Sequence, residues 1–236
     1  MKNMKPDFTK RSRFSRRAFT LTELLVVIAI MGIIAGFTIP VIKSVKRTQH
    51  LKTVRAELDH LETALENYKA QYGVYPPANQ NAASAGYQPA QLSQLYYELS
   101  GTTMGGGNFV ILDGSASIPT NSVTTAYGVA GFINCTHGGG QDAAPAKNFL
   151  SGLSSKEIYN SVTNNGVPTT VLVTSVGGPD TTYQPLGVSG LNPFRYVYPG
   201  VNNPGGYDLW VQLVINNQTN LICNWSRQVQ INNSLP

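Results

Sequence analysis

One uncharged, apolar segment near the N-terminus constrains this chain more than any other feature of its sequence. From Leu24 to Ile42 there is no Asp, Glu, Lys or Arg, and most side chains are large and apolar. At 1.5 Å per residue, these 19 residues would form a helix of roughly 28 Å, close to the thickness of a bilayer core. We therefore expect a membrane-spanning helix here.

The residues before this segment are basic. Residues 1–18 hold seven Lys and Arg residues against one acid, Asp7, a net charge of +6, so the rest of the chain carries −1 of the total +5. A positive flank stays on the cytoplasmic side, so the C-terminal bulk should be exported. The basic pI of 9.2 therefore belongs to this leader, and we expect no nucleic-acid partner.

Two simpler interpretations of the segment are an ordinary signal peptide and a plain single-pass anchor. A signal peptide has a shorter apolar region that ends at a small-x-small cleavage site, and no Ala-x-Ala site follows this one. A plain anchor does not explain Glu23, because a carboxylate at the border of an apolar span is costly unless it is paired. The nearest cations available to Glu23 are Arg17 and a new amino terminus made by cleavage.

The segment from Arg16 to Val27 resembles the cleavage and methylation signal of type IV prepilins and type II secretion pseudoprepilins. In that family a basic leader is cut before a hydrophobic residue, usually Phe, and Glu follows as the fifth residue of the mature chain. The resemblance implies a cut between Ala18 and Phe19, and N-methylation of Phe19 by the bifunctional prepilin peptidase. Ala18 stands where the family usually has Gly, so we expect slower cleavage.

The resemblance also implies how such a subunit assembles. The amine of Phe19 would pair with Glu23 of a neighbouring subunit or of its own chain, which offsets the desolvation of both charges and sets the axial register. Pro40 stands where family members commonly carry a helix-disrupting proline, and it is assigned to assembly as well. The expected domains are a leader (1–18), a transmembrane assembly half of the helix (19–42), an amphipathic half (43–73) and an extracytoplasmic globular domain (74–236).

The pattern after the apolar segment predicts a continuation of the helix. Seven apolar positions alternate spacings of three and four, which places them on one face: Leu51, Val54, Leu58, Leu61, Leu65, Tyr68 and Tyr72. Gly73 can end this helix, and Pro76-Pro77 forbid its continuation. We expect the apolar face to pack on the globular domain.

Strand patterns are clearest near the C-terminus. Residues 207–215 alternate apolar and other side chains, Asn216-Asn217 offers a turn, and 219–225 and 194–198 are further candidate strands. Between these and the long helix the sequence favours a short helix over 89–100 and strands over 109–112 and 167–176. The expected fold is α+β, with a long N-terminal helix packed on a small antiparallel β-sheet.

Two further segments resemble one subfamily, the major pseudopilin of type II secretion systems. Leu65 to Pro76 is similar to its tyrosine-bearing helix end, and Asn192 to Trp210 is similar to its C-terminal segment. The resemblance implies a structural subunit, not an enzyme, in the bacterial inner membrane with its globular domain in the periplasm. It implies a homopolymer, and contacts with minor pseudopilins, the prepilin peptidase/methyltransferase and an inner-membrane assembly platform.

A type IV pilus subunit for adhesion, motility or DNA uptake is the alternative function, and a membrane-anchored binding module is a third class of function.

Cysteines and metal ligands give weaker indications. An exported domain would permit a disulfide between Cys135 and Cys223, the alternative being two unpaired buried thiols. Major pseudopilins commonly bind calcium through an acidic C-terminal loop, but this chain has no Asp or Glu after Asp208. We therefore assign no metal residues and expect no cofactor.

Overall fold

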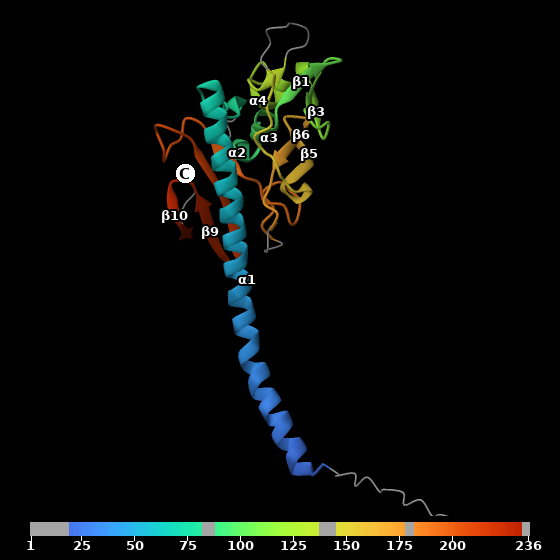
Figure 1. Ribbon diagram of the computed structural model, residues 1–236, viewed down its shortest axis with the longest axis vertical. Helices are drawn as coiled ribbons and strands as arrows, with labels where there is room; N and C mark the ends of the chain where they lie inside the picture. The colour runs from blue at the N-terminus through green and yellow to red at the C-terminus, as the bar shows by residue number, and fades with distance from the viewer. Residues whose placement is uncertain (1–18, 82–87, 137–144, 178–181, 233–236) are drawn as a thin grey trace, which may run out of the picture. The chain divides into compact units, whose positions relative to one another are not determined.

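A computed structural model describes residues 19–81, 88–136, 145–177 and 182–232 (Figure 1), with the side chains of 37–44 and 88–89 outside the description. The leader, including Ala18, lies outside the described residues. By its internal contacts the chain divides into two units, Met1–Lys46 and Arg47–Pro236, and each is described by itself.

The first helix, α1 (Leu21–Tyr72), contributes to both units. It ends as the sequence predicts: Gly73 has φ of +75° and its N–H donates to the carbonyl of Lys69 at 2.7 Å, a left-handed C-terminal cap. Within the described residues, no helix combines the length and the apolar character needed to cross a membrane. The span expected over Leu24–Ile42 runs into the stretch whose side chains lie outside the description.

A four-stranded antiparallel sheet in the second unit confirms the C-terminal strand predictions. Its order is β10-β9-β8-β7, and the three predicted strands are β7, β8 and β9. Asn216 and Asn217 form the tight turn between β8 and β9 and both have positive φ, which Asn tolerates better than most residues. The bounds are β7 (Arg195–Val197), β8 (Asp208–Ile215), β9 (Gln218–Cys223) and β10 (Ser226–Ile231).

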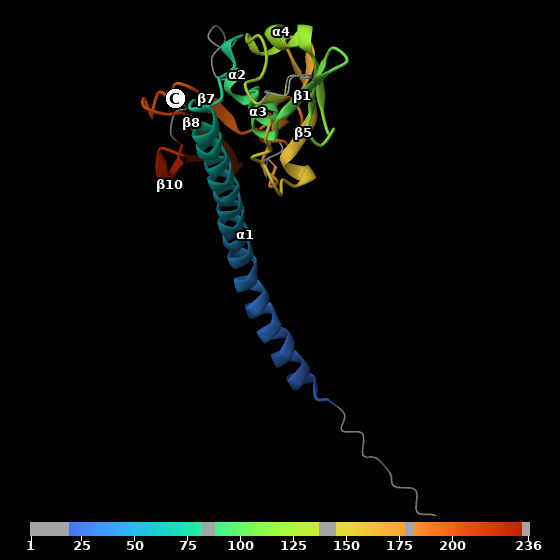
Figure 2. The same ribbon diagram turned by 45° about the horizontal axis from the view of Figure 1, so that its top comes forward.

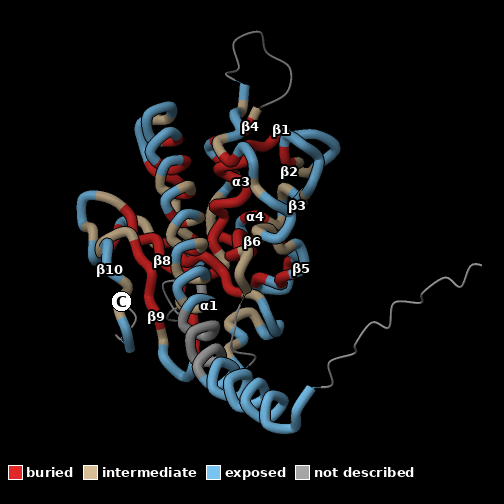
Figure 3. The backbone as a smooth tube through the Cα atoms, turned by 60° about the horizontal axis from the view of Figure 1, so that its bottom comes forward, coloured by how far each residue is buried: buried red, intermediate tan, exposed pale blue. Residues whose placement is uncertain are grey.

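The apolar face of α1 is buried, as the helical periodicity predicts. Val54, Leu58, Leu65 and Tyr68 have no exposed surface, and they belong to one core with Leu209 and its neighbours in the sheet. Figure 3 shows this buried face of α1 turned toward the strands. The α+β architecture with a long helix on an antiparallel sheet is therefore confirmed.

Residues 79–191 form a second set of elements, here called the insert, which shares the same core. Figure 2 shows it on one side of α1, with β7, β8 and β10 on the other. The predicted helix over 89–100 is two short helices, α2 and α3, and several strands were not predicted. The elements are α2 (Gln88–Gln91), α3 (Leu95–Ser100), β1 (Thr102–Gly105), β2 (Asn108–Ile111), β3 (Ser117–Pro119), η2 (Thr120–Ser122), α4 (Val123–Tyr127), β4 (Cys135–Thr136), η3 (Ser155–Glu157), β5 (Ile158–Asn164) and β6 (Val167–Leu172).

The insert has its own small sheets. Strands β1 to β4 form a sheet of order β3-β2-β1-β4 in which only the β1–β4 pair is parallel, and β5 and β6 form an antiparallel hairpin. Residues that flank the insert meet at the sheet: the hydroxyl of Tyr196 in β7 donates to the carbonyl of Pro76 at 2.7 Å. The N–H of Thr174 donates to the carbonyl of Asn192 at 2.8 Å.

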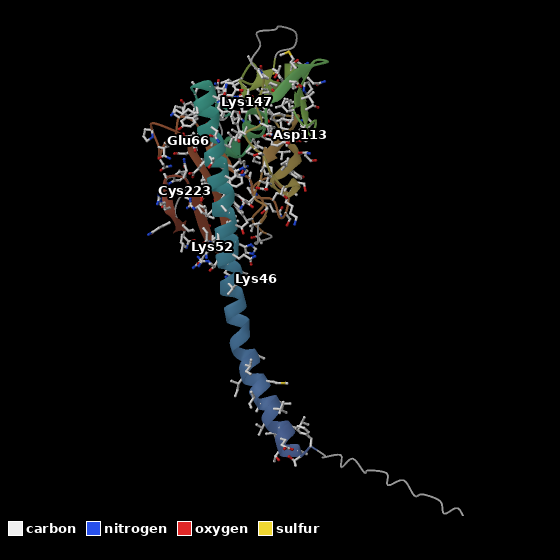
Figure 4. The ribbon with its side chains drawn as sticks, viewed as in Figure 1. Lys46, Lys52, Glu66, Asp113, Lys147 and Cys223 are labelled. Carbon is white, nitrogen blue, oxygen red and sulfur yellow. The ribbon has the colours of Figure 1, made fainter. Side chains whose placement is uncertain are left out.

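The predicted disulfide between Cys135 and Cys223 is wrong. Both cysteines are free thiols and both are buried. Cys135 lies in β4 of the insert, whereas Cys223 ends β9 in the other sheet (Figure 4) and packs with Trp210 and Leu221. Each thiol belongs to a different sheet and a different apolar cluster, and burial raises the pKa of both.

Candidate assembly site at the N-terminus

The N-terminal part of α1 exposes apolar side chains on every face. Figure 4 shows these side chains standing out from the helix. A helix that is apolar all round is normally buried in a membrane or among other helices, so this surface needs a partner. The large exposed side chains are Phe19, Leu21, Leu24, Leu25, Val26, Val27, Ile28, Ile30, Met31, Ile33 and Ile34.

Glu23 closes the first turn of this helix. Its Oε2 accepts hydrogen bonds from the N–H of Thr20 at 2.9 Å and from the hydroxyl of Thr20 at 2.8 Å. The N–H of Glu23 donates back to Thr20 Oγ1, at 3.3 Å. This reciprocal arrangement is a capping box, which satisfies donors that a helix N-terminus otherwise leaves free. This capping role was not predicted from the sequence, although Thr20-x-x-Glu23 is the spacing typical of a capping box.

Phe19 and Glu23 lie together. Both line a shallow hollow of about 500 Å³ on one side of the helix start, with Thr22, Val26 and Val27. Among the described residues, no Lys or Arg side chain pairs with Glu23. If the chain is cut before Phe19, the new amine therefore lies one turn from a carboxylate that has no cationic partner in the described part of the chain.

Of the four processing and assembly residues predicted from the sequence, the structure brings two together and leaves two undescribed. Phe19 and Glu23 share the hollow, Ala18 lies outside the described residues, and Pro40 falls within α1 in the stretch whose side chains are not described. The parts of the chain that the structure describes contain no group of three or more His, Cys, Asp or Glu side chains able to hold a metal ion.

Comparison with known protein families identifies the N-terminal segment. Residues 13–39 match the model of the prokaryotic N-terminal methylation motif, and this stretch contains the helix start, Phe19 and Glu23. The chain is therefore type IV pilin-like in this segment, as Arg16–Val27 led us to expect.

Within that class, the similarity is to proteins named type II secretion system core protein G. The chain is 36% identical over 85 residues to that of Klebsiella michiganensis, 34% over 74 residues to that of Escherichia coli K12, and 31% over 83 residues to that of Vibrio cholerae. These stretches cover 36%, 31% and 35% of this chain and 60%, 51% and 57% of the relatives. The chain thus spans half to three fifths of the length of these curated relatives. No solved structure matches it.

Proposed function

We propose that this chain is a structural subunit of a type II secretion pseudopilus, cut by a prepilin peptidase and polymerised through its N-terminal helix. The observation that carries the proposal is the start of α1, where the methylation motif, an exposed apolar helix and a carboxylate beside Phe19 coincide. The similarity to core protein G favours secretion over other uses of this helix.

The chemistry of processing follows from the placement of Phe19. Hydrolysis of the Ala18–Phe19 peptide bond leaves a carboxylate on the leader and an amine on Phe19, which the same enzyme methylates and which stays cationic at neutral pH. Before assembly the apolar helix lies in the inner membrane, with the globular domain in the periplasm. The apolar surface of α1 is then covered by the helices of other subunits.

Glu23 supplies the anion for the Phe19 amine of an adjacent subunit. A buried charge without a partner is strongly destabilising, so a subunit docked out of register would be rejected. Copies of this chain, minor pseudopilins and an inner-membrane assembly platform are the partners that this role requires. The role is one of assembly, and it requires no catalytic residue in this chain.

A type IV pilus subunit is the alternative, because the methylation motif covers only residues 13–39 and does not separate the two kinds of filament. Deletion of the gene distinguishes them. The secretion role predicts loss of exported proteins from the medium with cell motility and surface filaments unchanged, whereas the pilus role predicts the reverse.

Processing is tested by the intact mass of the protein purified from its native membrane. We expect a chain that begins at Phe19 and carries one methyl group on its amine. Retention of Met1, or a start beyond Ile42, would rule out both kinds of filament subunit.

A further inference from the structure

A buried arginine lies on the face of the sheet β10-β9-β8-β7, here called the main sheet, that points away from α1. Arg195 in β7 has 3% of its surface exposed. One guanidinium nitrogen, Nη2, donates to the hydroxyl of Tyr183 at 2.6 Å and lies 3.5 Å from Oε1 of Gln91, which is long for a hydrogen bond. The other, Nη1, is buried without an acceptor.

No carboxylate among the described residues forms an ion pair with this arginine. Asp208 is on the same face of the sheet, but its oxygens accept from the N–H groups of Val201, Asn202 and Asn203 at 2.8–3.0 Å. A buried charge without a counter-charge costs several kcal/mol, and proteins retain one chiefly where it has a use. The arrangement therefore calls for an anion.

A second unsatisfied donor belongs to the residue directly opposite Arg195 in the sheet. Arg195 is directly opposite Trp210 in the β7–β8 pair, and opposite residues in antiparallel strands project to the same face with Cβ atoms roughly 5 Å apart. The indole Nε1 of Trp210 is buried and has no acceptor either. Two buried donors on directly opposite residues, one of them cationic, complement the two oxygens of a carboxylate.

A pocket open to solvent lies beside Gln91, the side chain that faces Arg195. It has a volume of about 470 Å³, and Gln91, Ser161, Thr163, Gln184 and Pro185 are among its lining residues, none of which is charged. Gln91 separates the pocket from the guanidinium: its Nε2 donates to the carbonyl of Pro185 at 2.8 Å while its Oε1 faces Arg195 Nη2.

We propose that Arg195 and Trp210 form a binding site for a carboxylate group, entered through the pocket beside Gln91. One carboxylate oxygen accepts from Arg195 Nη1 and the other from Trp210 Nε1, while Gln91 turns aside. The carboxylate is that of a peptide chain end or of a small organic acid. The site is independent of assembly through the N-terminal helix.

The experiment uses the full-length chain in detergent and Trp210 as its own reporter. The chain has two tryptophans, so Trp225→Phe leaves the fluorescence of Trp210 alone. This parent is titrated at constant ionic strength with sodium acetate, N-acetyldiglycine and N-acetyldiglycinamide. We expect a saturable change with the acids and binding of the amide about ten- to hundredfold weaker, because the amide lacks the charge. If N-acetyldiglycine binds more tightly than acetate, the natural ligand is a peptide chain end. Equal affinities of the two acids indicate a small organic acid instead.

Arg195→Gln in the same parent should abolish the response to the acids. Lys156→Gln also removes one positive charge but lies at an exposed position, so this control variant should retain the response. Equal responses to acid and amide, or an undiminished response in Arg195→Gln, would overturn the proposal. Should Arg195→Gln fail to fold, Gln91→Ala decides instead. Because Gln91→Ala removes the side chain at the entrance, this variant should bind the two acids more tightly than the parent does. Its affinity for the amide should equal that of the parent. Any other result contradicts the proposed site.

Discussion

Glu98 shows how a single residue holds the insert to the helix. This carboxylate in α3 has no exposed surface, and three donors surround it: the hydroxyl of Tyr68 in α1 at 2.8 Å, and the N–H groups of Ile133 and Asn134, both at 3.0 Å. Asn134 in turn accepts from the hydroxyl of Tyr72 at 2.7 Å. One buried polar network therefore joins α3 to the C-terminal end of α1 and to the residues just before β4.

Glu98→Gln should destabilise the protein by about 1–3 kcal/mol. The amide has one acceptor oxygen where the carboxylate has two, so an NH₂ group would face the N–H of Ile133 or Asn134, donor against donor. Denaturant unfolding measures the change. Glu66→Gln is the matched control, since its remaining oxygen can still accept from the hydroxyl of Tyr75, and it should be near neutral. Equal stability of the two variants would mean that the network contributes nothing.

The same residue predicts a pH dependence. Burial raises the pKa of Glu98 more than its three donors lower it, so the folded protein holds this proton more tightly than the unfolded chain. Its contribution to stability is therefore complete below about pH 4.3, the ordinary Glu value, and is lost as pH rises through the folded pKa. The stability difference between wild type and Glu98→Gln should shrink over that range. Burial raises the pKa of Glu57 and Glu62 too, but both are present in each protein, so their effect cancels in this comparison. A difference that stays constant or grows with pH would contradict the assignment.

At the scale of elements, Arg55 connects α1 to the edge of the main sheet. Its guanidinium donates to the carbonyls of Cys223 at 2.8 Å and Ser226 at 2.9 Å, and more weakly to that of Arg227 at 3.3 Å. These carbonyls lie on either side of the turn between β9 and β10, at the last residue of β9 and the first two residues of β10. The planar, five-donor head of arginine can reach several carbonyls at once, which a lysine ammonium does less well.

Arg55→Lys should therefore loosen β10 without unfolding the sheet. We expect amide hydrogen exchange in Ser226–Ile231 to accelerate about tenfold, with β8 unchanged, because edge elements open locally at lower cost than central strands. Lys52→Arg, an exposed position one turn away, is the control and should alter neither strand. Exchange that accelerates equally in β8 and β10 would point to global destabilisation instead.

Periodicity predicted the elements that are long and lie on the core. The heptad-like spacing of Val54, Leu58, Leu61 and Leu65 identified the buried face of α1, and alternation along 207–215 identified β8. Strands β1, β3 and β4 are four residues or fewer, too short for alternation to show. The network around Glu98 was invisible for a different reason: its partners lie 30 to 36 residues away along the chain, and no local pattern links them.

At the scale of the whole molecule, Glu23 has two roles that one pair of variants can separate. Glu23→Leu removes both the cap of α1 and the charge, whereas Glu23→Gln keeps an oxygen for the N–H and hydroxyl of Thr20 and removes only the charge. If the charge pairs with the Phe19 amine of another subunit, both variants should fail to assemble, because an unpaired buried charge costs about 3–5 kcal/mol per subunit.

The measurement is the yield of sheared filaments, or of exported protein, beside the amount of membrane-bound subunit in a strain that lacks the native copy. We expect near-normal subunit and little filament for both variants. Normal assembly by Glu23→Gln with failure of Glu23→Leu would reduce Glu23 to a helix cap, and normal assembly by both would exclude any role in polymerisation.

The contact between Pro76 and Tyr196, which flank the insert on its two sides, has a consequence for how such a chain can change. A segment whose ends already touch can grow or shrink without moving its anchor points, since each doubling of a flexible connection costs only about 0.6 kcal/mol in closure entropy. Helix α1 and the sheet β10-β9-β8-β7 then form a constant scaffold, and residues 79–191 form an insertion that this scaffold carries. Selection can therefore replace this insertion while the N-terminal helix, through which the subunit is proposed to polymerise, stays unchanged.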